Sequence, residues 1–210
     1  MIQMPSYKLT YFNGKGRAEL TRLLFNAADV DFTDNRIDYY NDWPDLKPHM
    51  PNNQLPVLEI DGKYQLPQSL TIARYIARLY GMAGKDLFSE AWADYIVETF
   101  DDLHVEFGKT LNEKDEQKKA KLTRTFRETI LPRFLNNMEK TLKTNCGGEG
   151  YFVGDSLTWA DLQAYHILDI TTYDTPEILK DYPKLEGLKR RIENLPRIAE
   201  YLQTRPSSKI

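Results

Sequence analysis

The chain has 210 residues, of which 41% are hydrophobic and 28% are charged, and its net charge is −3. This composition is typical of one large or two small globular domains and excludes a disordered chain. The charge argues against a nucleic-acid partner, and the apolar runs are shorter than the roughly 20 residues of a membrane helix. A single cysteine, Cys146, excludes an internal disulfide. Because the N-terminus shows no signal-peptide pattern, we expect a cytoplasmic protein without membrane partners.

The first part of the chain alternates strands and helices. Residues 7–12 are rich in β-formers, a glycine turn follows, and residues 17–28 have helical apolar spacing. A second strand is predicted over 30–37, so strand, helix and strand make a βαβ unit with parallel strands. The three prolines in 39–51 predict a long irregular loop.

A hairpin and a helix follow this loop. Residues 57–60 form a short apolar run, and Asp61-Gly62 is typical of a two-residue turn in which both residues have φ > 0. Residues 63–66 are expected to return as the partner strand, and helical spacing starts directly after Gln68-Ser69. The free N–H groups at such a helix start attract a carboxylate or a phosphate. An ordinary hairpin followed by a helix explains the same pattern without any ligand.

The second part of the chain is helical almost throughout. Apolar positions predict helices over 92–107 and 122–142, with a kink at Pro132. Thr158 and Asp161 have the spacing of a capping box with Asp in place of Glu, and later helices are expected from Pro176, Leu185 and Pro196. The predicted fold is therefore α/β followed by all-α. A thioredoxin-like βαβ-ββα domain spans 6–83, and an all-helical domain spans 84–210.

The stretch Gln54-Leu55-Pro56-Val57-Leu58-Glu59-Ile60-Asp61-Gly62, followed by Gln68-Ser69, resembles the glutathione site of the cytosolic glutathione transferases. From Tyr7 onward the chain is similar to their sigma class, which includes prostaglandin D synthases of the haematopoietic type. The resemblance implies a homodimeric detoxification enzyme that conjugates glutathione to hydrophobic electrophiles.

The resemblance also implies specific roles. Tyr11 is the expected catalytic residue, Trp43 and Lys47 hold the glycine carboxylate, and Leu55 pairs with the cysteine of glutathione through its backbone before a cis Pro56. The full set of implied glutathione contacts is Tyr11, Phe12, Arg17, Trp43, Lys47, Gln54, Leu55, Pro56, Gln68, Ser69 and, from the neighbouring subunit, Asp102.

The chemistry required of Tyr11 follows from the thiol of glutathione. An unperturbed thiol has a pKa of about 8.5, so only about 3% is thiolate at pH 7. A hydroxyl that donates to the sulfur anion and lowers this pKa by about two units contributes roughly 2.7 kcal/mol. The alternative is that Tyr11 is only a half-buried aromatic residue of a strand.

Three acidic residues, Glu98, Asp101 and Asp102, share one helix face with i, i+3, i+4 spacing. A solvated acidic face is the ordinary explanation. In the prostaglandin synthases that the chain resembles, this face holds a divalent metal across the dimer axis, but here Glu98 replaces an aspartate. We expect no obligatory metal, and a possible one only at this position.

The pocket for the second substrate is expected to use Phe12, His104, Gln163 and Ile167. Lys109 occupies the position of a tryptophan in the prostaglandin synthases, which argues against prostaglandin isomerase activity. Three alternatives remain open beside glutathione conjugation: a glutathione-dependent prostaglandin-H2 D-isomerase, a non-catalytic carrier of haem or hydrophobic ligands, and a crystallin-like structural protein on the same fold.

Overall fold

The structure is a computed structural model that describes residues 5–208. The chain divides into two compact units between Met82 and Ala83. The first unit contains the described residues up to Met82 together with those from Asn194 onward, and the second unit is Ala83–Glu193. The expected helical domain extended over 84–210. The structure differs in its last segment, which packs with the first unit.

A four-stranded sheet with the order β2-β1-β3-β4 forms the first unit. Its strands are β1 (Tyr7–Phe12), β2 (Thr33–Ile37), β3 (Val57–Ile60) and β4 (Tyr64–Pro67). As predicted, β1 and β2 are parallel, whereas the β1–β3 and β3–β4 pairs are antiparallel. The β3–β4 turn has φ values of 55° and 62° at its two central residues, which confirms the predicted two-residue turn.

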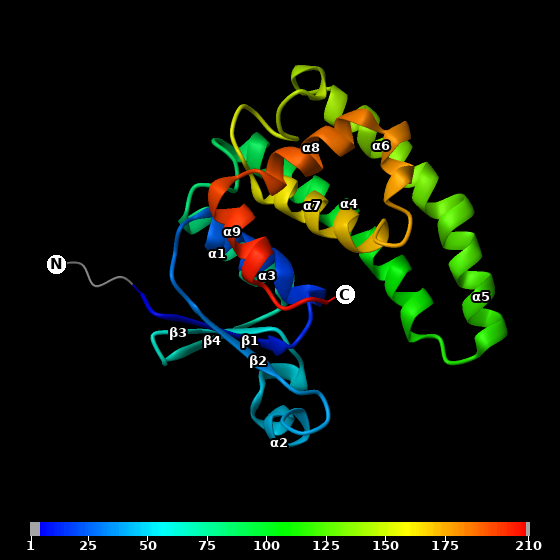
Figure 1. Cartoon of the computed structure of the whole chain (residues 1–210). Coiled ribbons are helices and arrows are strands. Elements are labelled where there is room, and N and C mark those ends of the chain that lie inside the picture. The colour runs from blue at the N-terminus through cyan, green and yellow to red at the C-terminus, as the bar shows by residue number, and fades with distance from the viewer. Residues whose placement is uncertain (1–4, 209–210) are drawn as a thin grey trace. The chain divides into compact units, whose positions relative to one another are not determined.

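Helices α1 (Glu19–Ala27), α3 (Ser69–Leu79) and α9 (Pro196–Thr204) cover one side of this sheet (Figure 1). Helix α1 contacts both α3 and α9. The apolar stripes that predicted the first two helices are buried, as Leu23, Leu24 and Ile76 show. Together these packed faces form the core of the first unit.

The segment between β2 and β3 is more ordered than expected. It contains helix α2 (Trp43–Leu46) and two 3₁₀ turns, Lys47–His49 and Pro51–Asn53. Each of these elements has a proline at its first or second position. Proline is favoured there because its φ suits a helix start and its missing N–H has no intrahelical partner in any case.

The unit Ala83–Glu193 is built from helices. Their bounds are α4 (Leu87–Asn112), α5 (Glu116–Thr125), α6 (Leu131–Lys143), α7 (Trp159–Thr171) and α8 (Pro183–Glu193). Helix α7 packs against α4 and α8, and almost every residue of α7 is buried. The helix expected from Pro176 is a 3₁₀ helix, Pro176–Asp181.

The predicted capping box at the start of α7 is present. The carboxylate of Asp161 accepts hydrogen bonds from the backbone N–H of Thr158 at 2.8 Å and of Phe152 at 2.7 Å, and from the Thr158 hydroxyl. Burial raises the pKa of Asp161 to about 6, although these hydrogen bonds favour the anion. Asp161 therefore joins the preceding loop to the helix that forms the centre of this unit.

The kink expected at Pro132 lies just before this residue. Residues Phe126–Ile130 form a π-helical segment between α5 and α6, and Pro132 stands in the first turn of α6. The proline ring clashes with the carbonyl four residues earlier, so the helix widens there instead of continuing regularly.

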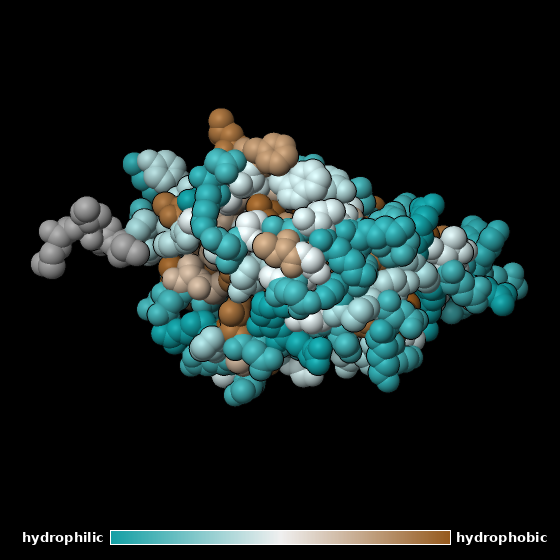
Figure 2. All heavy atoms as spheres, turned by 90° about the horizontal axis from the view of Figure 1, so that it is seen from above, coloured by the Kyte–Doolittle hydropathy of each residue, from teal (hydrophilic) through white to brown (hydrophobic). Residues whose placement is uncertain are grey.

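The face of the molecule seen in Figure 2 is mostly hydrophilic. Figure 2 shows one face of the molecule, on which apolar side chains occur in small groups among polar ones. Among residues 5–208, no helix is both long and apolar enough to cross a membrane.

Candidate functional site

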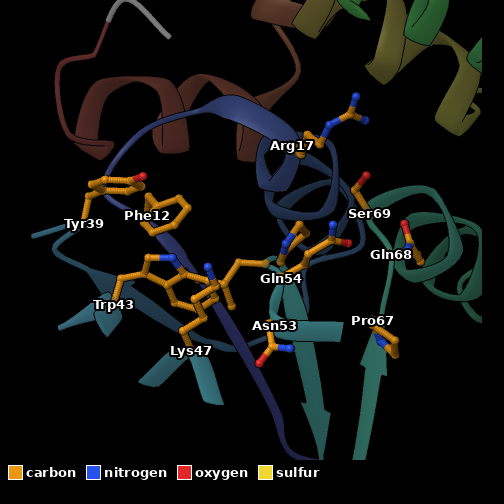
Figure 3. Close-up of a pocket in the computed structure, with 12 residues that line it drawn as sticks. Phe12, Arg17, Tyr39, Trp43, Lys47, Asn53, Gln54, Pro67, Gln68 and Ser69 are labelled. Carbon is orange, nitrogen blue, oxygen red and sulfur yellow. The ribbon is translucent and has the colours of Figure 1, made fainter. Parts of the chain in front are cut away.

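The first unit contains a cavity of about 360 Å³ beside the carboxyl end of β1 and the start of α3. Side chains from β1, α2 and the segments flanking β3 and β4 surround it (Figure 3). Its lining residues are Phe12, Arg17, Tyr39, Trp43, Lys47, Asn53, Gln54, Leu55, Pro56, Pro67, Gln68 and Ser69. Nine of the residues that the sequence predicted as glutathione contacts therefore lie around one cavity; the other three lining residues, Tyr39, Asn53 and Pro67, were not predicted.

One wall of the cavity is aromatic. The Phe12 ring lies 5.3 Å from the Tyr39 ring and 5.6 Å from the Trp43 ring, centroid to centroid, and meets Trp43 edge-on. Figure 3 shows these three rings grouped on one side of the cavity. Such aromatic pairs contribute about 0.5–1.5 kcal/mol beyond the area they bury, so they help to hold the loop around Trp43 in place.

The charges around the cavity suit an anionic ligand. Arg17 and Lys47 are exposed at the cavity, and none of its lining residues is acidic. Helix α3 begins at Ser69, so the unbonded N–H groups of its first turn adjoin the cavity, as predicted. The two cationic side chains and the helix N-terminus are separate positions that would each favour a carboxylate.

The backbone near the cavity departs from regular structure at several residues. The Leu55–Pro56 bond is cis, as the resemblance implied. Asn53 has a φ of 50° and Gln68 has a φ of 74°, values that residues other than glycine adopt rarely. Such conformations persist only where the surroundings hold them, and they are concentrated at functional sites.

Tyr11 is half-buried and lies between two residues that line the cavity. Its ring is 5.3 Å from that of Phe12, and its hydroxyl oxygen accepts a hydrogen bond of 3.2 Å from the Arg17 backbone N–H. In this hydrogen bond the phenol oxygen is the acceptor, so its own O–H can still donate to a third group. A sulfur anion at the cavity is such a group.

Gly16 fixes how closely the backbone approaches this phenol. Its φ is 41°, and a Cβ on Gly16 would lie 2.5 Å from the Tyr11 hydroxyl oxygen. Real Cβ contacts are essentially never shorter than 3.0 Å, so a side chain here would displace the phenol or the backbone. Glycine is therefore required by both the positive φ and the contact.

The acidic residues on α4 lie in the other unit. Asp102 and Glu98 are exposed, and the Asp101 carboxylate is 3.8 Å from Nδ1 of His104. Within residues 5–208 no group of three or more His, Cys, Asp or Glu residues is arranged to hold a metal ion. The possible metal site needs a second copy of the chain and stays a prediction.

The residues predicted for the second-substrate pocket have different environments. Phe12 lines the cavity, and His104 is partly exposed, with its ring 5.8 Å from that of His166. Gln163 and Ile167 on α7 are buried, with 2% and 0% of their surface exposed. Their role in binding a second substrate stays a prediction.

Three lining residues were not predicted from the sequence: Tyr39, Asn53 and Pro67. Asn53 and Pro67 each adjoin a predicted residue, so extending the motif by one position would have found them. Tyr39 gave no local signal, because its place at the cavity depends on ring contact with Phe12, which is 27 positions earlier in the chain.

Comparisons with known proteins agree with this geometry. The family model of the glutathione S-transferase N-terminal domain matches residues 7–78, and that of the C-terminal domain matches residues 101–205. The first match contains Tyr11 and every residue that lines the cavity.

Several known proteins are similar to this chain over almost its whole length. S-crystallin SL11 of Nototodarus sloanii is 42% identical over 96% of this chain and 98% of its own length. Hematopoietic prostaglandin D synthase of Gallus gallus is 41% identical over 99% of this chain and 100% of its own length. The solved structure of the rat hematopoietic prostaglandin D synthase in complex with a quinoline has a TM-score of 0.89, 32% identity and coverage of 98% and 100%. These relatives confirm the sigma-class resemblance, and the chain belongs to the glutathione S-transferase family.

Proposed function

We propose that this protein is a cytoplasmic glutathione transferase in which Tyr11 stabilises the glutathione thiolate for attack on hydrophobic electrophiles. The thiolate donates an electron pair to an electrophilic carbon, and a carbon–sulfur bond forms. The displaced electron pair leaves with a leaving group or is protonated on the electron-withdrawing part of the acceptor. The enzyme's contribution is a larger fraction of thiolate at neutral pH and an oriented sulfur.

One observation carries this proposal. The phenol oxygen of Tyr11 accepts a hydrogen bond from the Arg17 N–H beside the cavity. The cavity itself is surrounded by two cationic side chains, a helix N-terminus and the backbone around Leu55. This combination matches a peptide with two carboxylates and a central thiol. A purely structural protein does not require these groups to surround one cavity.

The decisive experiment measures ionisation of the bound thiol. Ultraviolet difference spectra follow thiolate absorbance of the glutathione complex against pH, and a chromogenic halonitrobenzene reports turnover. If Tyr11 lowers the thiol pKa by about two units, Tyr11→Phe decreases the thiolate fraction at pH 6.5 about 50-fold, with glutathione affinity nearly unchanged.

Tyr7→Phe is the matched control. Tyr7 is on the same strand, but it is buried and accepts a hydrogen bond of 3.2 Å from the Tyr80 hydroxyl. Its variant removes a phenol oxygen from β1 without touching the cavity, so the bound-thiol pKa should stay at the wild-type value. Equal thiol pKa values in the wild type and Tyr11→Phe would remove Tyr11 from the mechanism.

The S-crystallin relatives favour a second candidate, a crystallin-like structural or ligand-carrying protein. Such a protein would bind hydrophobic ligands or haem, or simply persist at high concentration, without turnover. Retention on immobilised glutathione together with absent conjugation of several electrophiles would support it. A prostaglandin-H2 D-isomerase activity, suggested by the Gallus gallus relative, is tested by product analysis with that endoperoxide.

A homodimer with shared sites is part of the proposal. Asp102 is exposed on α4, where a neighbouring subunit's glutathione amine would find an anionic partner. Heterodimers of Tyr11→Phe and Asp102→Asn subunits test this arrangement. If sites are shared, one site carries both changes and the other is intact, so about half of the wild-type activity remains. If each subunit uses its own Asp102, both sites are impaired.

Two finer proposals are tested in the same preparation. A divalent metal at Glu98, Asp101 and Asp102 of paired subunits would make activity respond to chelator and added Mg²⁺. Substitution of His104, Gln163 or Ile167 would change the KM for the electrophile and leave the KM for glutathione unaltered if these residues contact the second substrate.

A further inference from the structure

We propose that Arg22 is a positioning residue for Tyr11 and that helix α9 holds Arg22 in place through Glu19. The effect on catalysis rests on the proposed role of Tyr11, whereas the effect on loop position does not. All residues of this network lie in the first unit.

The side chain of Arg22, on α1, contacts the segment that joins Tyr11 to Arg17. Its guanidinium donates to the carbonyl oxygens of Gly14 at 2.6 Å, Lys15 at 3.3 Å and Phe12 at 3.5 Å. The guanidinium carbon is 5.8 Å from the centroid of the Tyr11 ring. One side chain therefore holds three carbonyls between Phe12 and Lys15 and lies over the ring of Tyr11, near the end of β1.

Burial makes Arg22 dependent on its anionic partners. The side chain is 0% exposed, and it forms ion pairs with Asp34 at 3.1 Å and with Glu19 at 3.4 Å. A buried arginine stays charged, and the loss of one partner of a buried pair leaves an uncompensated charge. The guanidinium would then move toward solvent or toward the remaining carboxylate, and its contacts with the loop would change.

Glu19 is held in turn from the far end of the chain. Its carboxylate accepts a hydrogen bond of 3.0 Å from the Tyr201 hydroxyl and pairs with Arg205 at 2.7 Å. Burial and the charge of Glu19 raise the pKa of Tyr201, which keeps this hydroxyl protonated as a donor. Tyr201 is on α9 and Arg205 directly follows it, so the C-terminal segment completes the surroundings of Glu19.

The loop constrains the position of the phenol oxygen. The Arg17 N–H that donates to Tyr11 lies at the end of this loop, and Gly16 approaches the hydroxyl so closely that a Cβ would overlap it. A displacement of about 1 Å at a reacting group can decrease a rate by 10²-fold. A change at Arg205, which is not a cavity residue, should therefore reach the bound thiol through Glu19, Arg22 and the loop.

The experiment compares Arg205→Gln with a matched control, Arg197→Gln. Arg197 is on α9 and pairs with Asp29 at 2.6 Å, so each variant loses an ion pair between the C-terminal segment and the rest of the first unit. Of these two ion pairs, only the one with Arg205 includes a residue, Glu19, that also pairs with Arg22. We expect Arg205→Gln to raise the bound-thiol pKa by about half a unit and to lower kcat/KM about two-fold at pH 6.5, with Arg197→Gln at the wild-type values.

Arg22→Lys tests the network at its centre. Lysine keeps the charge but lacks the planar set of donors that reaches several carbonyls at once, so kcat/KM should fall about ten-fold or more. Circular dichroism establishes whether each variant is folded. If Arg22→Lys does not fold, Arg205→Gln decides the proposal. Folded variants with the wild-type thiol pKa, or equal shifts in Arg205→Gln and Arg197→Gln, would overturn it.

Hydrogen–deuterium exchange without glutathione separates this inference from the proposed function. Backbone amides of residues 12–17 should exchange faster in Arg205→Gln and Arg22→Lys than in the wild type, and at the wild-type rate in Arg197→Gln. If the wild-type protein fails to lower the thiol pKa, the proposed function fails, and exchange alone decides whether the network positions the loop. Unchanged exchange in both network variants would overturn the positioning role.

Discussion

The two units of the chain differ in how regular their backbone is. In the first unit, five described non-glycine residues have positive φ, and two of them, Asn53 and Gln68, line the cavity, as does the cis proline Pro56. In the described residues of the helical unit, the one such residue is Cys146, in an exposed loop. The helical unit instead contains long helices with buried apolar faces and a complete capping box.

This difference shows which part of the molecule is shaped by binding and which by packing. Regular helices satisfy their own backbone groups, so little backbone is left to meet a ligand. Irregular turns direct N–H groups and short side chains into a cavity, although they are less favourable locally. Substitutions at the irregular backbone beside the cavity should therefore affect activity, whereas substitutions in the helical unit outside the proposed binding residues Asp102, His104, Gln163 and Ile167 should affect stability.

The largest expected effect is on activity and comes from Gly16→Ala. The new methyl group would overlap the Tyr11 phenol, so kcat/KM should fall about 100-fold and the bound-thiol pKa should rise. Gly62→Ala is the control, since Gly62 also has positive φ but a methyl group there would meet no atom within 4 Å. Both variants should lose about 1 kcal/mol of stability. An active Gly16→Ala protein would contradict the positioning of the phenol.

A large effect on stability alone is expected from Asp161→Asn. The amide cannot accept all the hydrogen bonds of the buried carboxylate, so the free energy of unfolding should fall by about 2 kcal/mol at pH 7, with the bound-thiol pKa unchanged. Urea unfolding measures the first quantity and ultraviolet spectra the second.

The stability difference between the wild type and this variant should depend on pH, because only the wild type has a titrating group at residue 161. The folded-state pKa of Asp161, about 6, lies above the unfolded value, so the native state binds the proton more tightly. The stability that this proton binding adds is fully present below pH 4 and is lost as the pH rises from 4 to 6. The difference in stability between the wild type and Asp161→Asn should therefore narrow from pH 4 to pH 7. A widening difference would show that the hydrogen bonds outweigh burial.

A smaller, two-sided effect is expected from Gln68→Gly. Glycine adopts the φ of 74° without strain, so stability should rise by about 1 kcal/mol, while the KM for glutathione should increase because a cavity side chain is lost. Gln68→Asn keeps an amide and tolerates positive φ, so its stability and its KM for glutathione should lie between those of the wild type and Gln68→Gly. A stability gain without any change in KM would remove Gln68 from the binding site.

The smallest effect is expected from Pro132→Ala. Alanine restores a backbone N–H and removes the ring that widens the preceding helix, so the melting temperature should shift by only a few degrees, equivalent to about 1 kcal/mol or less. Because Pro132 is neither a cavity residue nor one of the residues proposed to bind a substrate, glutathione binding should be unchanged. A large loss of glutathione affinity would contradict the claim that Pro132 affects packing and not binding.

Several elements of the fold could be predicted from local patterns. The Asp61-Gly62 turn, the α3 start at Ser69 and the Thr158–Asp161 capping box each depend on residues a few positions apart. One expectation was wrong for an identifiable reason. The prolines of 39–51 indicated an irregular chain, but they stand in the first turns of helical elements. The interruption expected at Pro132 is present as the π-helical segment directly before this residue.

By itself, then, the sequence determined the strand and helix order, the family, and most residues around the cavity, because motif spacing encodes short-range geometry. Tertiary structure alone decided that Tyr39 joins the aromatic wall and that α9 packs on α1. It also decided that Glu19 meets Tyr201 and Arg205, which follow it by 182 and 186 positions. No local spacing specifies which distant side chains meet, since that depends on how the packed helices and the sheet bring them together.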